Sequence, residues 1–133
     1  MIWLAALWLA WACFNICLAT WGPVPVGWAY THGMGPWRRI VVTPEMTSAL
    51  SVEEVRAVIL HELGHVECCH TEINLAWAIF AGGWGRVARA ERQEFEADEF
   101  AARCGYGVEL ARALTKLGGD RERVRVGRLV HGS

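Results

Sequence analysis

The chain has 133 residues, of which 53% are hydrophobic and 20% are charged, and its formal net charge is −1. This length suits one folded domain, and the composition excludes intrinsic disorder, which requires low hydrophobicity and high net charge. The balanced charge provides no basic field for nucleic acid, so we expect no nucleic-acid partner. Five cysteines without a C-x-x-C pair argue against a disulfide framework and against a thiolate zinc site.

The first part of the chain is uncharged. Residues 1–37 contain no Asp, Glu, Lys or Arg, and residues 2–21 form one apolar stretch of 20 residues. As a helix this stretch would be roughly 30 Å long, the thickness of a bilayer's hydrocarbon core. We therefore expect a transmembrane anchor helix over residues 1–21 and one domain over residues 22–133. A cleaved signal peptide and a buried core helix are the alternatives.

The first charged residues, Arg38 and Arg39, follow the apolar stretch, and no basic residue precedes it. The positive-inside tendency then places the charged domain in the cytoplasm. The sequence thus predicts a single-pass membrane protein with a cytoplasmic domain. Signal cleavage would instead give a secreted or periplasmic protein.

Two short strands are expected after the apolar stretch. Apolar residues alternate with period two over residues 24–30, although Pro25 restricts that strand to an edge. Residues 39–43 are rich in β-branched side chains and predict a second strand, which could pair with the first as a hairpin.

Helices dominate the rest of the chain. Ser51 and Glu54 form a capping box, and apolar residues at helical spacing behind them predict a helix over residues 52–70. The fold class expected is therefore α+β, mainly α. Further helices are expected over residues 73–80, 87–104 and 108–117, and alternating Arg and Val predict a final strand at residues 123–126.

An H-E-x-x-H motif lies on the 52–70 helix, at His61, Glu62 and His65. The two histidines are four residues apart, so both imidazoles project from one helix face and can reach one metal ion. Glu62 is rotated by about 100° from His61, which lets its carboxylate reach a metal-bound water. Zn²⁺ suits such a site, because it accepts imidazole and carboxylate ligands and keeps a position open for water.

A catalytic zinc site needs a third protein ligand, and the stretch Glu94-Phe95-Glu96-Ala97-Asp98 offers one. On a helix, Glu94 and Asp98 share a face. Glu94 can complete the site while Asp98 accepts a hydrogen bond from a ligating histidine. Glu91 is an alternative third ligand, and Glu96 is expected to point elsewhere.

Taken together, HELGH and the later EFEAD-x-FA resemble the membrane-associated gluzincin metallopeptidases, represented by the CAAX prenyl protease and the bacterial HtpX protease. The resemblance covers residues 40–118 and implies a minimal zincin-like domain in which the HExxH helix, the E-x-x-A-D helix and a small sheet meet. It assigns zinc binding to His61, His65 and Glu94, the general base to Glu62, and a supporting role to Asp98. Members of the family usually have several transmembrane helices and a longer chain.

These features predict a zinc-dependent metalloendopeptidase that acts on a peptide or protein substrate and is held to a membrane by its N-terminal helix. An edge strand, residues 39–43, could pair with an extended substrate. Two enzyme families remain open, since repressor-cleaving metallopeptidases of phages and bacteria also combine HExxH with an E-x-E-A stretch. A catalytically silent, zinc-stabilised binding module is the alternative from another class, and a metal-free membrane protein is a third.

Several other polar residues receive no catalytic role. Cys68 and Cys69 diverge by about 100° on a helix, so they are interpreted as structural thiols and His70 as a lone structural or surface histidine. A donor to the reaction's oxyanion is also needed. The residues downstream of Glu94 that could serve are Arg103, Tyr106 and His131, among which the spacing selects none.

Overall fold

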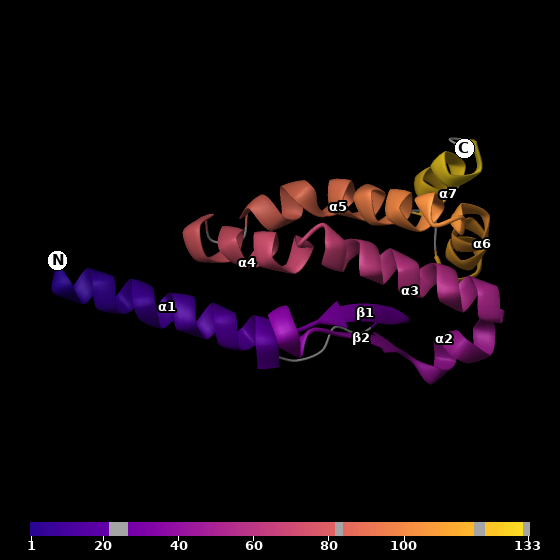
Figure 1. The fold of residues 1–133 in the computed structure, drawn as a ribbon. Coiled ribbons are helices and arrows are strands. Elements are labelled where there is room, and N and C mark those ends of the chain that lie inside the picture. The colour runs from indigo at the N-terminus through magenta and orange to yellow at the C-terminus, as the bar shows by residue number, and fades with distance from the viewer. Residues whose placement is uncertain (22–26, 82–83, 119–121, 132–133) are drawn as a thin grey trace.

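The computed structural model describes residues 1–21, 27–81, 84–118 and 122–131, and it is mainly helical with one small sheet (Figure 1). This confirms the expected α+β, mainly α, class. The elements in chain order are α1 (Ile2–Trp21), β1 (Ala29–His32), a 3₁₀ turn (Gly35–Trp37), β2 (Arg39–Val42), α2 (Pro44–Ala49), α3 (Val52–Glu67), α4 (His70–Ala81), α5 (Trp84–Arg103), α6 (Gly107–Leu117) and α7 (Arg123–His131).

The two strands form the predicted hairpin. They are antiparallel, with Ala29 opposite Val42 and His32 opposite Arg39. The first strand therefore starts later than the alternation predicted, and residues 22–26 lie outside the described part of the chain. Gly33 makes the turn possible, because it has a φ of +87° and a Cβ there would lie 2.4 Å from the Trp37 carbonyl oxygen.

The predicted 52–70 helix ends at Glu67, and the next helix, predicted over residues 73–80, already begins at His70. Ser51 and Glu54 form the expected capping box at the start of α3. At its end, Cys69 adopts a left-handed conformation with a φ of 53°, and the chain changes direction before His70 begins α4. A non-glycine residue at positive φ is uncommon, and nothing in the local spacing places the break at Cys69.

Close packing of α3 on α5 brings the two sequence motifs together. Gly64 of HELGH faces Ala97 of EFEAD, and a Cβ on Gly64 would lie only 2.8 Å from the Ala97 Cα. Both residues are buried. The absence of a side chain at Gly64 thus sets the distance at which the HExxH helix meets the later acidic helix.

The hydrophobic core is formed by α3 together with α2, α5 and the C-terminal helices α6 and α7. Met46 of α2 and Leu110 of α6 are its largest fully buried side chains. The expected final strand is wrong, since residues 123–131 form α7. Its apolar residues Val126 and Leu129 are three apart, so both contact the core from one face of the helix. The alternation that predicted a strand covers only residues 123–126, which is too short to decide between strand and helix.

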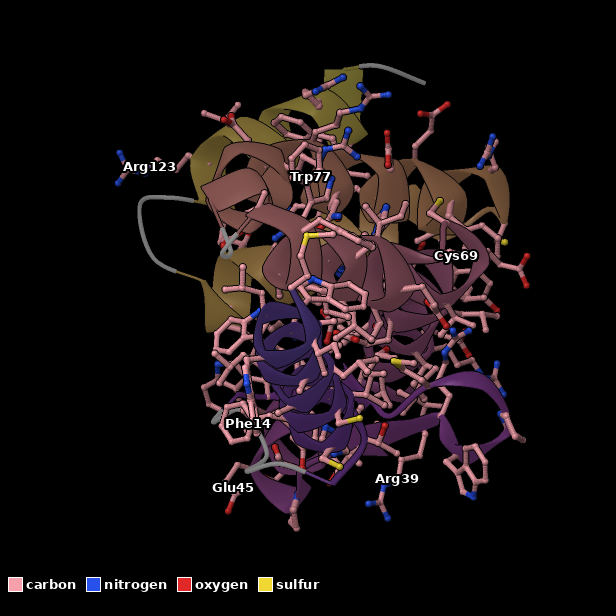
Figure 2. The ribbon with its side chains drawn as sticks, turned by 90° about the vertical axis from the view of Figure 1, so that its left-hand side faces the viewer. Phe14, Arg39, Glu45, Cys69, Trp77 and Arg123 are labelled. Atoms are coloured by element: carbon pink, nitrogen blue, oxygen red, sulfur yellow. The ribbon has the colours of Figure 1, made fainter. Side chains whose placement is uncertain are left out.

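The N-terminal helix α1 extends from the rest of the chain. It is long and apolar enough to cross a membrane over Ile2–Thr20, with 6% of that stretch buried. Its ring contact with α4 joins Trp8 to Phe80, with 5.8 Å between centroids. Figure 2 looks towards this helix and shows side chains such as Phe14 projecting from it. Such exposure argues against the core-helix alternative; a membrane span and a signal sequence share these properties.

Candidate metal centre

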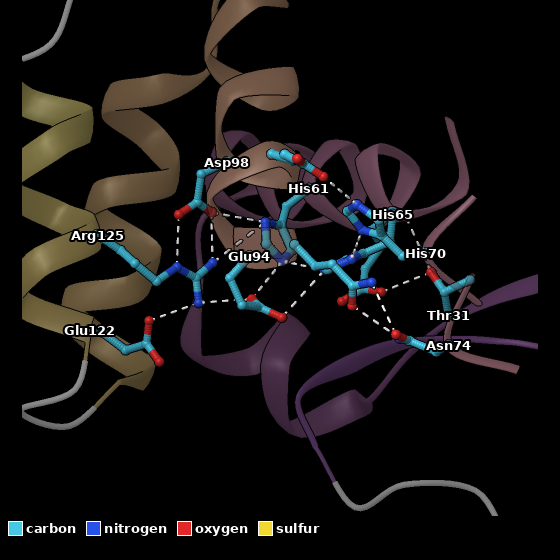
Figure 3. Close-up of polar contacts among 12 residues, drawn as sticks. Thr31, His61, His65, His70, Asn74, Glu94, Asp98, Glu122 and Arg125 are labelled. Atoms are coloured by element: carbon cyan, nitrogen blue, oxygen red, sulfur yellow. Dashed lines mark hydrogen bonds and ion pairs between the residues drawn. The ribbon is translucent and has the colours of Figure 1, made fainter. Parts of the chain in front are cut away.

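Three side chains from the two motifs converge where α3 crosses α5 (Figure 3). The Nε2 atoms of His61 and His65 lie 3.2 Å apart. The Glu94 carboxylate oxygens lie 3.4 Å from the His61 Nε2 and 3.6 Å from the His65 Nε2. Ligands about 2.1 Å from a tetrahedral zinc ion are about 3.4 Å from one another, so these residues fit zinc in chemistry and in spacing.

The other ring nitrogen of His61 contacts a buried carboxylate. The Nδ1 atom lies 2.9 Å from Asp98 Oδ1, and the Asp98 residue is 4% exposed. Burial alone would lower the pKa of His61, but hydrogen bonds to Asp98 and Glu94 outweigh it and raise that pKa to about 9. The pocket therefore stabilises positive charge at this point and leaves the His61 Nε2 aimed at the other two groups.

The pKa of His65 moves the other way. Burial and the nearby charge of His61 lower the pKa of His65 to about 4. Both opposing shifts arise within one cluster, because only one imidazole can hold the extra proton when the rings are in contact. The metal-free cluster thus holds its extra proton on His61 at neutral pH, and a bound metal would have to displace that proton.

Arg125 of α7 places a positive charge beside the carboxylates of the cluster. Its guanidinium donates to both Asp98 oxygens, at 2.6 and 2.7 Å, and lies 3.1 Å from Glu94 and 2.8 Å from Glu122. Burial would raise the pKa of Asp98, but hydrogen bonds from Arg125 and His61 outweigh it and lower that pKa. The sequence interpretation missed Arg125 because it assigned residues 123–126 to a strand.

Glu62 is held by the hairpin. The Thr31 hydroxyl of β1 donates to Glu62 Oε2 at 2.8 Å and approaches the Glu62 backbone oxygen at 3.2 Å. Glu62 is 9% exposed and does not belong to the three-residue cluster, which is the placement expected of a base rather than a ligand. No sequence signal distinguishes Thr31 from other threonines, so this contact emerges only from the fold.

A cavity of about 660 Å³ opens beside these groups. Glu62, His65 and Glu94 line it, together with β1, α4 and the end of α1 around Asn15 and Leu18. The strand along this cavity is β1, whereas the strand suggested for substrate pairing, residues 39–43, does not line it.

The remaining sequence candidates lie elsewhere. Glu91 is exposed and is not part of the cluster, so the structure favours Glu94 over it as a third ligand. Arg103 and Tyr106 do not line the cavity, and the side chain of His131 lies outside what the structure describes.

His70 is not the lone histidine that was expected. It is 2% exposed and contacts both His65 and Glu96, so Glu96 does point away from the cluster of His61, His65 and Glu94, towards this ring. Cys68, His70 and Glu96 form a second group close enough to hold a metal ion. Burial raises the pKa of the Cys68 thiol, which disfavours the thiolate that a metal ligand needs.

Comparison with known families agrees with this geometry. Residues 23–83 match peptidase family M48. This segment of the chain is similar to the M48 peptidases. M48 enzymes are zinc metallopeptidases, and the matched segment contains both histidines of the HExxH motif and ends before Glu94. Of the two enzyme families left open by the sequence, the match favours the gluzincin metallopeptidases over the repressor-cleaving enzymes. No curated protein and no solved structure matched significantly.

Proposed function

We propose that this M48-related chain is a zinc-dependent endopeptidase whose metal is held by His61, His65 and Glu94. The observation that carries the proposal is the set of ligand-atom separations, 3.2 to 3.6 Å, beside a carboxylate that is separately anchored. A structural zinc site would be closed by a fourth protein ligand, whereas His65 and Glu94 of this trio line an open cavity.

In this proposal Glu62 is the general base. Bound zinc would supply Lewis-acid polarisation of the scissile carbonyl and make a water molecule more acidic. The Glu62 carboxylate takes the proton of the attacking water and delivers it to the leaving amine. The Thr31 hydroxyl holds Glu62 Oε2, which leaves Oε1 for the proton. Asp98 and Arg125 keep the His61 ring oriented throughout.

The substrate would bind as an extended peptide along β1. This strand has one hydrogen-bonded neighbour, β2, among the described residues, and it faces the cavity that contains Glu62. A peptide pairing with its other edge would gain backbone hydrogen bonds and would bring a scissile bond towards the base.

The position of α1 suggests that the protein works at a membrane surface. Asn15 and Leu18 near the end of this helix line the active-site cavity, so a membrane-inserted α1 would hold the cavity close to the bilayer. We place the domain on the cytoplasmic side because basic residues near a span favour that side of the membrane. Arg39 follows the span and is exposed, so its charge is free to act in this way, while the charge of Arg38 is paired with Glu72 of α4.

The proposal is tested by Glu62→Gln in the full chain, purified in detergent and loaded with zinc. Cleavage of a fluorescein-labelled casein should fall by about 10² to 10⁴-fold, while the zinc content stays at the wild-type value. Glu53→Gln is the matched control, because Glu53 is an exposed carboxylate on the same helix, and it should cleave normally. A silent binding module would retain zinc but show no cleavage in the wild type, which would refute the proposal.

A further inference from the structure

His70 occupies a position that the proposed mechanism does not use. It begins α4, directly after the left-handed Cys69, and its side chain is 3% exposed. On a continuous helix, residues five apart would point about 140° away from each other. The change of direction at Cys69 instead brings His70 Nδ1 to 2.7 Å from His65 Nδ1 (Figure 3).

The other nitrogen of His70 contacts an acidic group of α5. Its Nε2 lies 2.9 Å from Glu96 Oε2, and the second oxygen of Glu96 accepts from Arg92 Nε at 2.7 Å. Glu96 is therefore fixed from both sides. The result is a chain of contacts from Arg92 through Glu96 and His70 to His65, ending at the proposed zinc ligands.

The chemistry of this chain allows one arrangement of protons when His70 is neutral. An ionised carboxylate only accepts, so His70 must donate from Nε2 to Glu96. A neutral imidazole has one N–H, which leaves His70 Nδ1 as an acceptor. His65 must then donate from Nδ1, and its Nε2 has a free lone pair directed at His61 and Glu94.

We propose that His70 is a positioning residue which, together with Glu96, sets the His65 tautomer so that Nε2 is free for zinc. The inference rests on the proposed zinc site and assigns the second histidine a partner comparable to the one that Asp98 provides for His61. The Cys68, His70 and Glu96 group then needs no metal of its own, because both His70 ring nitrogens already have partners.

Replacing Glu96 by Gln tests the direction of donation with little change in shape. The amide can donate to His70 Nε2 as well as accept from it, so the constraint on both rings is removed. Glu96 is partly exposed, and the substitution should leave the fold intact. Glu99→Gln is the control, since Glu99 is an exposed carboxylate on the same helix and the charge change is identical.

The experiment uses the full chain in detergent micelles, labelled with ¹⁵N-histidine, in its metal-free state. Long-range ¹H–¹⁵N correlation spectra should show His65 protonated at Nδ1 and His70 at Nε2 in the wild type and in Glu99→Gln. Glu96→Gln should show mixed tautomers, and its zinc affinity, measured by competition with a chromophoric chelator, should fall by about 10 to 100-fold.

Two results would overturn the inference: His65 protonated at Nε2 in the wild type, or Glu96→Gln matching the wild type in tautomers and zinc affinity. The failure of the proposed function would look different. In that case the wild type would bind no zinc, whatever tautomers its spectra show.

Discussion

Substitution of Gly64 by Ala tests the close packing that sets the metal geometry. The new Cβ would lie 2.8 Å from the Ala97 Cα and 3.0 Å from the Ala97 carbonyl oxygen. An ordinary carbon–carbon contact is about 3.5–4.0 Å, so α3 and α5 must separate by roughly 1 Å. Because His61 and His65 lie on one helix and Glu94 on the other, this separation increases the distances from Glu94 to the two histidines.

The magnitude follows from two opposing terms. Overpacking costs about 1–3 kcal/mol, and replacing glycine within a helix recovers about 1 kcal/mol. The metal-free Gly64→Ala protein should therefore be destabilised by about 0–2 kcal/mol. Its zinc affinity should fall by about tenfold or more, because a site tolerates displacements of only about 0.5 Å.

Gly127→Ala is the matched control. Gly127 is also a helical glycine, but a Cβ there meets nothing within 4 Å, so the change should stabilise the protein by about 0.5–1 kcal/mol. Thermal unfolding followed by circular dichroism gives the stability, and chelator competition gives the zinc affinity. If Gly64→Ala bound zinc as tightly as the wild type, the packing argument would be refuted.

Three further substitutions probe single contacts. Arg125→Met should destabilise the metal-free protein by about 1–3 kcal/mol, since the buried Asp98 carboxylate loses its guanidinium partner and keeps its contact with His61. Added zinc should restore part of the loss in thermal unfolding. Thr31→Val should lower kcat by about tenfold with unchanged zinc content, because the base loses its anchor. The pKa of Glu54 is lowered, chiefly by its hydrogen bond from Lys116, so its stabilisation is present above pH 4.5 and is lost as the pH falls through the lowered pKa. Glu54→Gln should thus unfold more easily than the wild type at pH 6 and similarly in strong acid. An acid-independent difference would contradict that assignment.

Local sequence patterns predicted much of the fold because they act over one or two turns. The Ser51 capping box is an i to i+3 signal, and the spacing of His61 and His65 places both on one helix face before any tertiary contact exists. The pairing of these residues with Glu94 required a chemical argument, the need for a third ligand, rather than a pattern.

Long-range contacts account for what the sequence did not predict. Arg125 meets Asp98 from a separate helix, and Thr31 meets Glu62 from a strand 31 residues away. The left-handed Cys69, which ends α3 before the predicted boundary at residue 70, depends on tertiary packing as well. Where the signal was a four-residue alternation, as in α7, helical packing of Val126 on the core overrode it.

The central claim is that three residues hold one zinc ion. Zinc content of the full chain in detergent, after metal loading and removal of the excess, tests it most directly. The account predicts one zinc per chain for the wild type and for Glu91→Ala, and a loss of most of that zinc for Glu94→Ala. A folded wild-type protein without zinc, or one that loses zinc with Glu91 rather than with Glu94, would contradict it.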